Sequence, residues 1–190
     1  MNQNNSGLVI AAIIIVVLGI LTWWLWGGGN ALPGMNNEMA TSTATTSPVA
    51  RTNRSSQDVV AIAESISGTS RFGALFISTG VASSIKATGK YTIFVPTDGA
   101  FNLLAPGSLD NMTAAAKKRL VQYHVVSGRV VDIDALVSSN ITALSGDMLN
   151  FNIGPTDKVP RVNSSLIIAA YTGKNGIVYV VNNVLIPPKK

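Results

Sequence analysis

The sequence predicts an α+β domain that follows one apolar transmembrane helix and a polar linker. Helical patterns fill the first part of the globular region, up to about residue 124, and strand patterns dominate the remainder. Helices first and strands later are typical of α+β folds, whereas a parallel α/β sheet alternates the two along the chain. An uncharged apolar run near the amino terminus stands apart from both patterns.

The composition narrows the classes of partner and chemistry. The chain has 190 residues, with Lys+Arg 14, Asp+Glu 9, one His and no Cys, and only 12% of its residues are charged. The densest basic run, residues 117–119, points its three helical side chains about 100° apart and is interpreted as a solvated face. We therefore expect no nucleic-acid partner. The absence of cysteine excludes a disulfide scaffold and thiolate chemistry.

Residues 8–26 are expected to be a transmembrane anchor behind a short polar tail, residues 1–7. The segment reads LVIAAIIIVVLGILTWWLW and has no charge. Its length as a helix would be about 28 Å, close to the hydrocarbon thickness of a bilayer. Three Trp residues gather at its carboxyl end, where indole rings favour the membrane interface.

A cleaved signal peptide and a buried core helix are the alternatives for this segment. A signal peptide normally has basic residues before a shorter apolar core, and here no Lys or Arg precedes the run. An uncleaved anchor is therefore favoured, and a secreted form that has lost the segment stays open. Neither flank carries nearby Lys or Arg, so the positive-inside rule gives little guidance on orientation.

Residues 27–57 are expected to be a disordered linker, and residues 58–188 a folded domain. Gly, Ser, Thr, Asn and Pro dominate the linker, which has too few apolar residues to offset the entropy of ordering. Such a linker would hold the domain clear of the lipid headgroups, at a typical reach of about 30 Å.

The first half of the domain carries three helical patterns and one strand pattern. Asp58 is placed to cap a helix over VVAIAESI, and a second helix is expected over about residues 72–85. YTIFV, residues 91–95, is rich in β-branched and aromatic residues and predicts a strand that ends at Pro96. Asp98 is placed to cap a helix over GAFNLL.

The second half moves from helix to strands. A helix is expected over about residues 112–124, with the Asp or Asn just before it as its cap. MLNFNI, residues 148–153, alternates apolar and polar side chains as a half-buried strand does. Two apolar runs then flank GKNG, in which Asn175-Gly176 suits a type I′ hairpin turn.

Three segments resemble the conserved boxes of the fasciclin domain family, in that family's order and at about its spacing. They are YTIFVPTDGAF (91–101), LVQYHVVSGRV (120–130) and NGIVYVVNNVLIPP (175–188). The resemblance implies a fasciclin-like fold in which amino-terminal helices pack on a β-sandwich or wedge, in a single copy. Asn182-Asn183 departs from the acidic residue that is usual after the final strand.

The residues of the first box, 91–101, are interpreted mainly as determinants of the fold and not as a binding site. Short polar residues are placed to satisfy backbone groups where the strand ends and the helix begins, and the Phe residues supply core area. The residues concerned are Thr92, Phe94, Pro96, Thr97, Asp98 and Phe101.

Tyr123 and His124 are the candidate binding residues. In the resembled family this Tyr-His region is implicated in adhesive contacts with cell-surface receptors. The residues themselves indicate a second interpretation, in which His124 lies on the apolar line of its helix and is hydrogen-bonded inside the domain. Both interpretations stay open at this point.

No enzyme, metal site or cofactor is expected. One His without Cys makes a poor set of zinc ligands, and no phosphate loop or nucleophile motif occurs. Asp132 and Asp134 could form a pair of acids or a site for a hard cation, but a solvated turn is the simpler interpretation.

The sequence thus predicts a cell-surface adhesion or interaction module held by a single-pass anchor, with its carboxyl-terminal domain outside the cytoplasm. The expected partner is an extracellular protein or polysaccharide. The alternative is a small hydrophobic ligand in a cleft between the helices and the β layer.

Overall fold

The structure is a computed structural model that describes residues 49–128, 130–133 and 138–189. These residues belong to one compact unit, Thr45–Lys190. The predicted tail, the anchor at 8–26 and most of the linker lie outside the described residues. Within the described ranges, no helix is both long and apolar enough to cross a bilayer.

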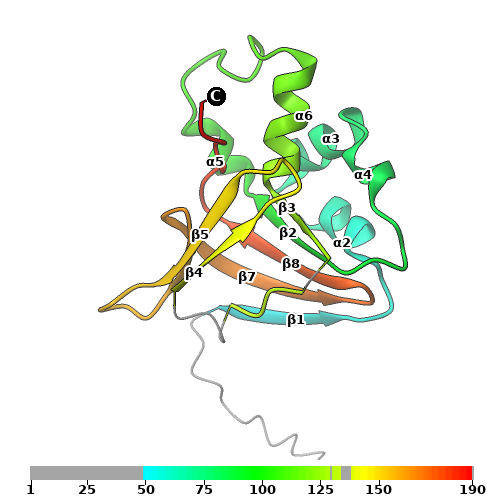
Figure 1. The fold of residues 1–190 in the computed structure, drawn as a ribbon, viewed down its shortest axis with the longest axis vertical. Helices are drawn as coiled ribbons and strands as arrows, with labels where there is room; N and C mark the ends of the chain where they lie inside the picture. Colours follow the sequence, from blue (N-terminus) through cyan, green and yellow to red (C-terminus); the bar gives the residue numbers. More distant parts are fainter. Residues whose placement is uncertain (1–48, 129, 134–137, 190) are drawn as a thin grey trace, which may run out of the picture. The chain divides into compact units, whose positions relative to one another are not determined.

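The predicted α+β class is confirmed: apart from the strands at Ala50–Arg54 and Tyr91–Pro96, the helices precede the strands (Figure 1). The helices form where apolar residues recur at helical spacing, and the strands where β-branched and aromatic residues dominate. In chain order the elements are β1 (Ala50–Arg54), α2 (Val59–Ser65), α3 (Ser70–Ser78), α4 (Val81–Ser84), β2 (Tyr91–Pro96), α5 (Asp98–Asn102), α6 (Ala114–Tyr123), β3 (Val125–Ser127), β4 (Ser138–Thr142), β5 (Met148–Ile153), β6 (Pro160–Val162), β7 (Ser165–Gly173) and β8 (Gly176–Val181).

The strands form one curled sheet in the order β3-β2-β8-β7-β6-β5-β4, with β1 added in parallel to β7. Strands β2 and β8 form a parallel pair within it, in which Tyr91 lies opposite Gly176. The backbone N–H of Leu144 donates to the Val125 carbonyl at 2.6 Å and joins the turn after β4 to β3. The expected sandwich or wedge is therefore a nearly closed, barrel-like sheet.

Two apolar cores lie on the two faces of β2 and β8. Successive strand residues point to opposite faces, so Phe94 enters the core inside the curl, while Ile93 and Val95 enter the core under the helices. The inner core is built on aromatic rings, with Phe94 and Tyr179 stacked at 5.7 Å between centroids. Strands β2 and β8 thus join the helices to the barrel, because their side chains belong to both cores.

The folded domain begins before the predicted boundary at residue 58. Val49 is only 4% exposed and belongs to the inner core, and β1 pairs residue by residue with β7, from Ala50 opposite Ala169 to Arg54 opposite Gly173. The assignment of residues 27–57 to the linker was therefore wrong at its carboxyl end. The rest of that linker, residues 27–48, lies outside the described residues.

The helix boundaries differ from the predictions in two places. The helix expected over 72–85 is divided into α3 and α4 by Gly80, whose φ of 72° suits glycine and ends the first helix. The helix expected to begin at Met112 begins at Ala114, because the Thr113 side chain accepts from the Ala116 N–H and caps it. The predicted cap of α2 is confirmed, since Asp58 accepts from the Ala61 N–H at 2.9 Å.

The type I′ turn occurs in a different hairpin from the predicted one. Asn163 and Ser164 join β6 to β7 with φ values of 46° and 69°, the positive pair that defines a two-residue I′ turn. In the β7–β8 hairpin the two loop residues are Lys174 and Asn175, and neither is among the described residues with positive φ. Gly176 is instead required by its close approach to β2.

Candidate interaction surface

Helix α6 brings together the residues of the second box. Arg119 and Tyr123 are four positions apart and share one side of the helix, and His124 is its C-cap. All three direct polar atoms at backbone or carboxylate groups of distant segments. The segments they hold are the turn between β4 and β5, and the stretch that follows β8.

His124 is 1% exposed and both ring nitrogens are hydrogen-bonded to backbone. Nδ1 lies 2.8 Å from the Leu120 carbonyl, which can only accept, so Nδ1 carries the proton. Nε2 accepts from the Leu185 N–H at 3.0 Å. Burial lowers the pKa of His124 to about 4, with a smaller opposing effect of the bond to Leu120, so the ring is neutral at pH 7.

Tyr123 is 2% exposed and its hydroxyl is used twice inside the domain. It donates to the Met148 carbonyl at 2.8 Å and accepts from Asn163 Nδ2 at 2.6 Å. Burial raises the pKa of Tyr123, so the phenol keeps its proton. The hydroxyl therefore joins α6 to the start of β5 and to the β6–β7 turn.

Arg119 links the two surface segments to each other. Its guanidinium donates to both carboxylate oxygens of Asp147, with its shortest contact at 2.8 Å, and to the Pro188 carbonyl at 2.9 Å. Asp147 is held further by the Ser145 hydroxyl at 2.9 Å. Arg119 thus has a specific structural partner, which corrects its interpretation as part of a solvated basic face.

These contacts fix a surface that we call the α6 surface, formed by residues 147–148 and 185–188. Two apolar side chains project from it, Met148 with 59% and Ile186 with 52% of its surface exposed. Each neighbours a backbone group that Tyr123 or His124 holds. The arrangement suits non-covalent contact with a partner. Any contribution of Tyr123 and His124 to binding would be indirect, through the segments they position.

The six box residues lie in the core or at helix ends. Phe94 and Phe101 are buried, and Pro96 pairs with Val181 at the end of β2. The Thr92 hydroxyl is buried and accepts from the Val131 N–H at 2.9 Å. Two further members, Thr97 and Asp98, cap α5 and α3 respectively.

The described residues offer little for metal or acid–base chemistry. No three His, Cys, Asp or Glu side chains come together in the ranges that the structure describes. Asp132 lies 3.8 Å from the Arg51 guanidinium. Asp134, the second acid of the sequence hypothesis, lies outside the described residues.

A sequence model of a protein family, described as the fasciclin domain, matches residues 67–187 of this chain. The chain belongs to the fasciclin domain family. Its curled sheet also resembles a FAS1 domain pair from the insect cell adhesion molecule Fasciclin I. That similarity has a TM-score of 0.52 at 20% identity and covers 65% of this chain and 47% of the other.

Several relatives carry the same domain in proteins of different size. Protein sll1483 of Synechocystis is 28% identical over 67% of this chain and 73% of its own length. Mouse Stabilin-2 is 30% identical over 62% of this chain but only 5% of its own length. The cell surface glycolipoprotein MPB83 of Mycobacterium bovis is 30% identical over 53% of this chain and 45% of its own length. Fasciclin domains thus occur in proteins named for the cell surface and for adhesion.

Sequence reasoning missed most of the α6 surface. Tyr123 and His124 pointed to the region, but Arg119, Met148 and Ile186 were not singled out. Arg119 sits in a run of basic residues that is usually solvated, and its partner Asp147 is 28 residues away. Met148 lies at the start of the strand pattern MLNFNI and directly precedes Leu149, so no local pattern marked it as an exposed apolar residue.

Proposed function

We propose that this chain is a membrane-tethered, non-enzymatic interaction module that binds an extracellular protein through the α6 surface. The observation that carries the proposal is the contrast between the polar and the apolar side chains at this surface. Arg119, Tyr123 and His124 use their polar groups to hold backbone inside the domain, while Met148 and Ile186 are left more than half exposed. Exposed apolar side chains in a polar frame favour a protein surface as the partner.

The tether is proposed from the sequence and from the relatives' names. Residues 8–26 would anchor the chain, and residues 27–48 would give a flexible reach of about 25 Å if they behave as a random coil. Relatives named as cell surface and cell adhesion proteins support a domain outside the cytoplasm. Protease treatment of intact cells tests this placement, since an internal domain would be protected.

The test of binding uses cells that display the full chain and a surface coated with their own extracellular matrix. The double variant Met148→Asp and Ile186→Asp should reduce attachment to the level of cells that lack residues 58–188. Ile77→Asp is the matched control, because Ile77 is 58% exposed on α3 and lies outside the α6 surface. Full attachment by the double variant, or equal loss in the control, would overturn the proposal.

The alternative of a small hydrophobic ligand has less support. The space between the helices and the sheet is filled by side chains such as Phe72, Phe76 and Val178, which are at most 1% exposed. A pocket of about 490 Å³ opens between α3, α5 and the loop after α5, but Arg71, Asn102 and Asp110 are among its lining residues. Arg71 and Asn102 are hydrogen-bonded to each other at 3.0 Å, but a purely apolar ligand would still remove these charged and amide groups from water at a cost.

A further inference from the structure

Four basic residues lie near one end of the sheet and belong to none of the segments that form the α6 surface. We call them the basic rim: Arg54, Lys86, Lys90 and Lys174. The strand register places Arg54, Lys90 and Lys174 together, and Lys86 lies in the loop that leads to β2. Arg54 pairs with Gly173 and Gly173 with Gly176, and Gly176 pairs in turn with Tyr91, the residue after Lys90. Neighbouring strands are about 4.8 Å apart, so this row of strand ends extends for about 14 Å.

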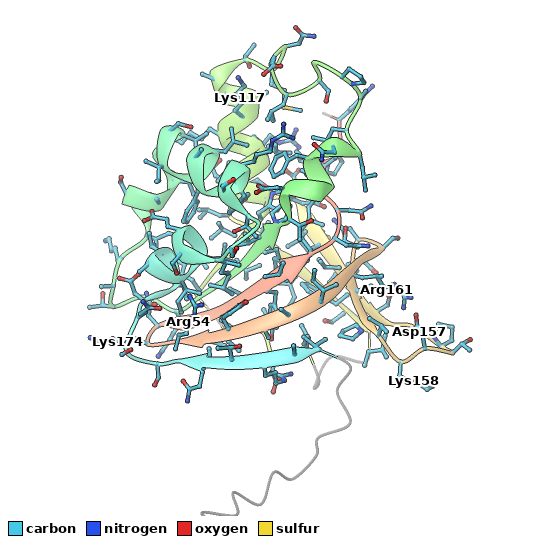
Figure 2. All side chains as sticks on the ribbon, turned by 180° about the vertical axis from the view of Figure 1, so that it is seen from behind. Arg54, Lys117, Asp157, Lys158, Arg161 and Lys174 are labelled. Carbon is cyan, nitrogen blue, oxygen red and sulfur yellow. The ribbon has the colours of Figure 1, made fainter. Side chains whose placement is uncertain are left out.

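Backbone contacts fix the loops that carry the rim. The Lys174 N–H donates to the Gln57 carbonyl at 2.7 Å, and the Gln57 N–H donates to the Arg54 carbonyl at 2.9 Å. The Lys86 N–H donates to the Tyr91 hydroxyl at 3.1 Å, which holds the approach to β2 against the strand. Figure 2 shows Arg54 and Lys174 side by side at this end of the sheet, away from Lys117 on α6.

The side chains of the rim are presented to solvent. Lys86, Lys90 and Lys174 are exposed, and Arg54 is half-buried. The Arg54 guanidinium lies 4.8 Å from the centroid of the Tyr171 ring and donates to Ser65 Oγ at 2.9 Å. A guanidinium held over an aromatic ring is already oriented, so less entropy is lost when it binds an anion.

Carboxylates elsewhere in the described residues are mostly engaged. Asp132, Asp147 and Asp157 pair with arginines outside the rim. Asp58 and Glu64 are the acids in the α2 segment that borders the rim, and Asp58 accepts the Ala61 N–H as the cap of α2. None of the ion pairs found in the described part of the chain involves a rim residue. The rim is therefore a surface of net positive charge.

We propose that the basic rim binds a linear acidic polysaccharide. A row of cations across four strand ends matches an extended polyanion, whose charges repeat along one line. A second argument comes from the direction of β1. The linker joins β1 at Ala50 and the rim lies at Arg54, four residues or about 13 Å further along the strand. The rim is thus at the opposite end of β1 from Val49, where the described part of the chain begins.

The preference for a polysaccharide over the cell's own anionic lipid rests on the proposed membrane tether. The ability of the rim to bind anions does not depend on that tether. Binding should weaken as salt rises, because exposed charges are screened over about 10 Å at 0.1 M ionic strength.

The test uses the full chain in discs of neutral lipid, with polygalacturonate and heparin as probes. The double variant Lys90→Glu and Lys174→Glu should bind both probes at least about tenfold more weakly at low salt, a loss of about 1.4 kcal/mol. Lys117→Glu with Lys118→Glu is the matched control, with the same change in net charge on α6. The control should retain nearly all of the binding.

Three outcomes would overturn the proposal. Equal loss in the control would show attraction by net charge alone. If the unchanged chain bound neither probe, a linear acidic polysaccharide would be excluded as the ligand of the rim. Binding to vesicles rich in phosphatidylglycerol but to neither probe would assign the rim to a membrane surface. The variant carrying Met148→Asp and Ile186→Asp should bind the probes normally, so failure here and failure of the α6 surface can be told apart.

Discussion

The carboxylate of Asp98, in the first turn of α5, accepts a hydrogen bond of 2.8 Å from the backbone N–H of Arg71. Its other oxygen accepts from the Ser70 hydroxyl at 2.9 Å. Thr69, the N-cap of α3, makes no side-chain cap bond, so Asp98 caps that helix from the neighbouring one. The Arg71 N–H is the main cause of the lowered pKa of Asp98. The adjacent Thr97 caps α5 itself.

Asp98→Ala should lower the free energy of unfolding by about 1 kcal/mol, the usual value of a helix cap. The lost acceptor leaves the first N–H groups of α3 to water. Urea unfolding of the variant and the unchanged chain measures the difference. Asp110→Ala is the control, since Asp110 is an exposed acid in the loop between α5 and α6. A cost no larger than that of the control would contradict a capping role for Asp98.

The sequence predicted those elements whose signal is local. VVAIAESI, YTIFV and MLNFNI each carry their own period, and Asp58 caps the helix that directly follows it. Asp98 was expected to do the same, but its partner is a helix that precedes it by 27 residues. Such a cap depends on tertiary packing, which local spacing does not encode.

The missed strand and the missed surface have the same physical explanation. β1 reads ARTNR and is exposed over most of its length, so it has no apolar alternation. It is held by backbone pairing to β7 and by contacts of its two arginines with distant residues. Arg119 has a sequence context typical of a solvated lysine-rich helix, and its role follows from the distant Asp147 and Pro188. Both features need the register of the complete sheet before they can be recognised.

The stability of the domain should fall as the pH drops from 7 to 5, because His124 is neutral in the fold. Its pKa is about 4 when folded and 6.5 in the unfolded chain, so the stabilisation is complete above pH 6.5 and is lost towards pH 4. The expected loss between pH 7 and pH 5 is about 2 kcal/mol. Equilibrium urea unfolding at a series of pH values measures it.

His124→Phe separates this effect from other titrations. The variant should be less stable at pH 7 by about 1–3 kcal/mol, because the Leu185 N–H loses its acceptor. Its stability should change much less between pH 7 and pH 5. The pKa values of Asp98 and Asp157 are lowered, so their contributions are lost below this window. An unchanged slope in the variant would exclude His124 as the source.

Tyr123→Phe should cost about 1–2 kcal/mol of stability, because the Met148 carbonyl and the Asn163 amide each lose a hydrogen-bond partner. Tyr171→Phe is the control, since its ring lies against Arg54 and its hydroxyl makes no hydrogen bond to any residue that the structure describes. Thermal unfolding of both variants provides the comparison. Equal small losses would mean that the Tyr123 hydroxyl contributes nothing specific to the α6 surface.

Two glycines in the family boxes should respond in opposite directions to alanine. At Gly176 a Cβ would lie 1.8 Å from the Tyr91 carbonyl oxygen, so β8 would have to separate from β2 where their pairing begins. We expect Gly176→Ala to lose more than about 3 kcal/mol or to fail to fold, since close-packed backbone cannot yield at low cost.

At Gly99 the nearest atom to a Cβ would be the Thr97 Oγ1 at 3.7 Å, an ordinary contact, and the residue is exposed within α5. Gly99→Ala should therefore stabilise the domain by about 0.5–1 kcal/mol, because alanine loses less backbone entropy in a helix. Unfolding curves of the two variants decide the matter. A stable Gly176→Ala variant would show that β2 and β8 are not paired as closely as described, and the sheet order on which the basic rim depends would fall with it.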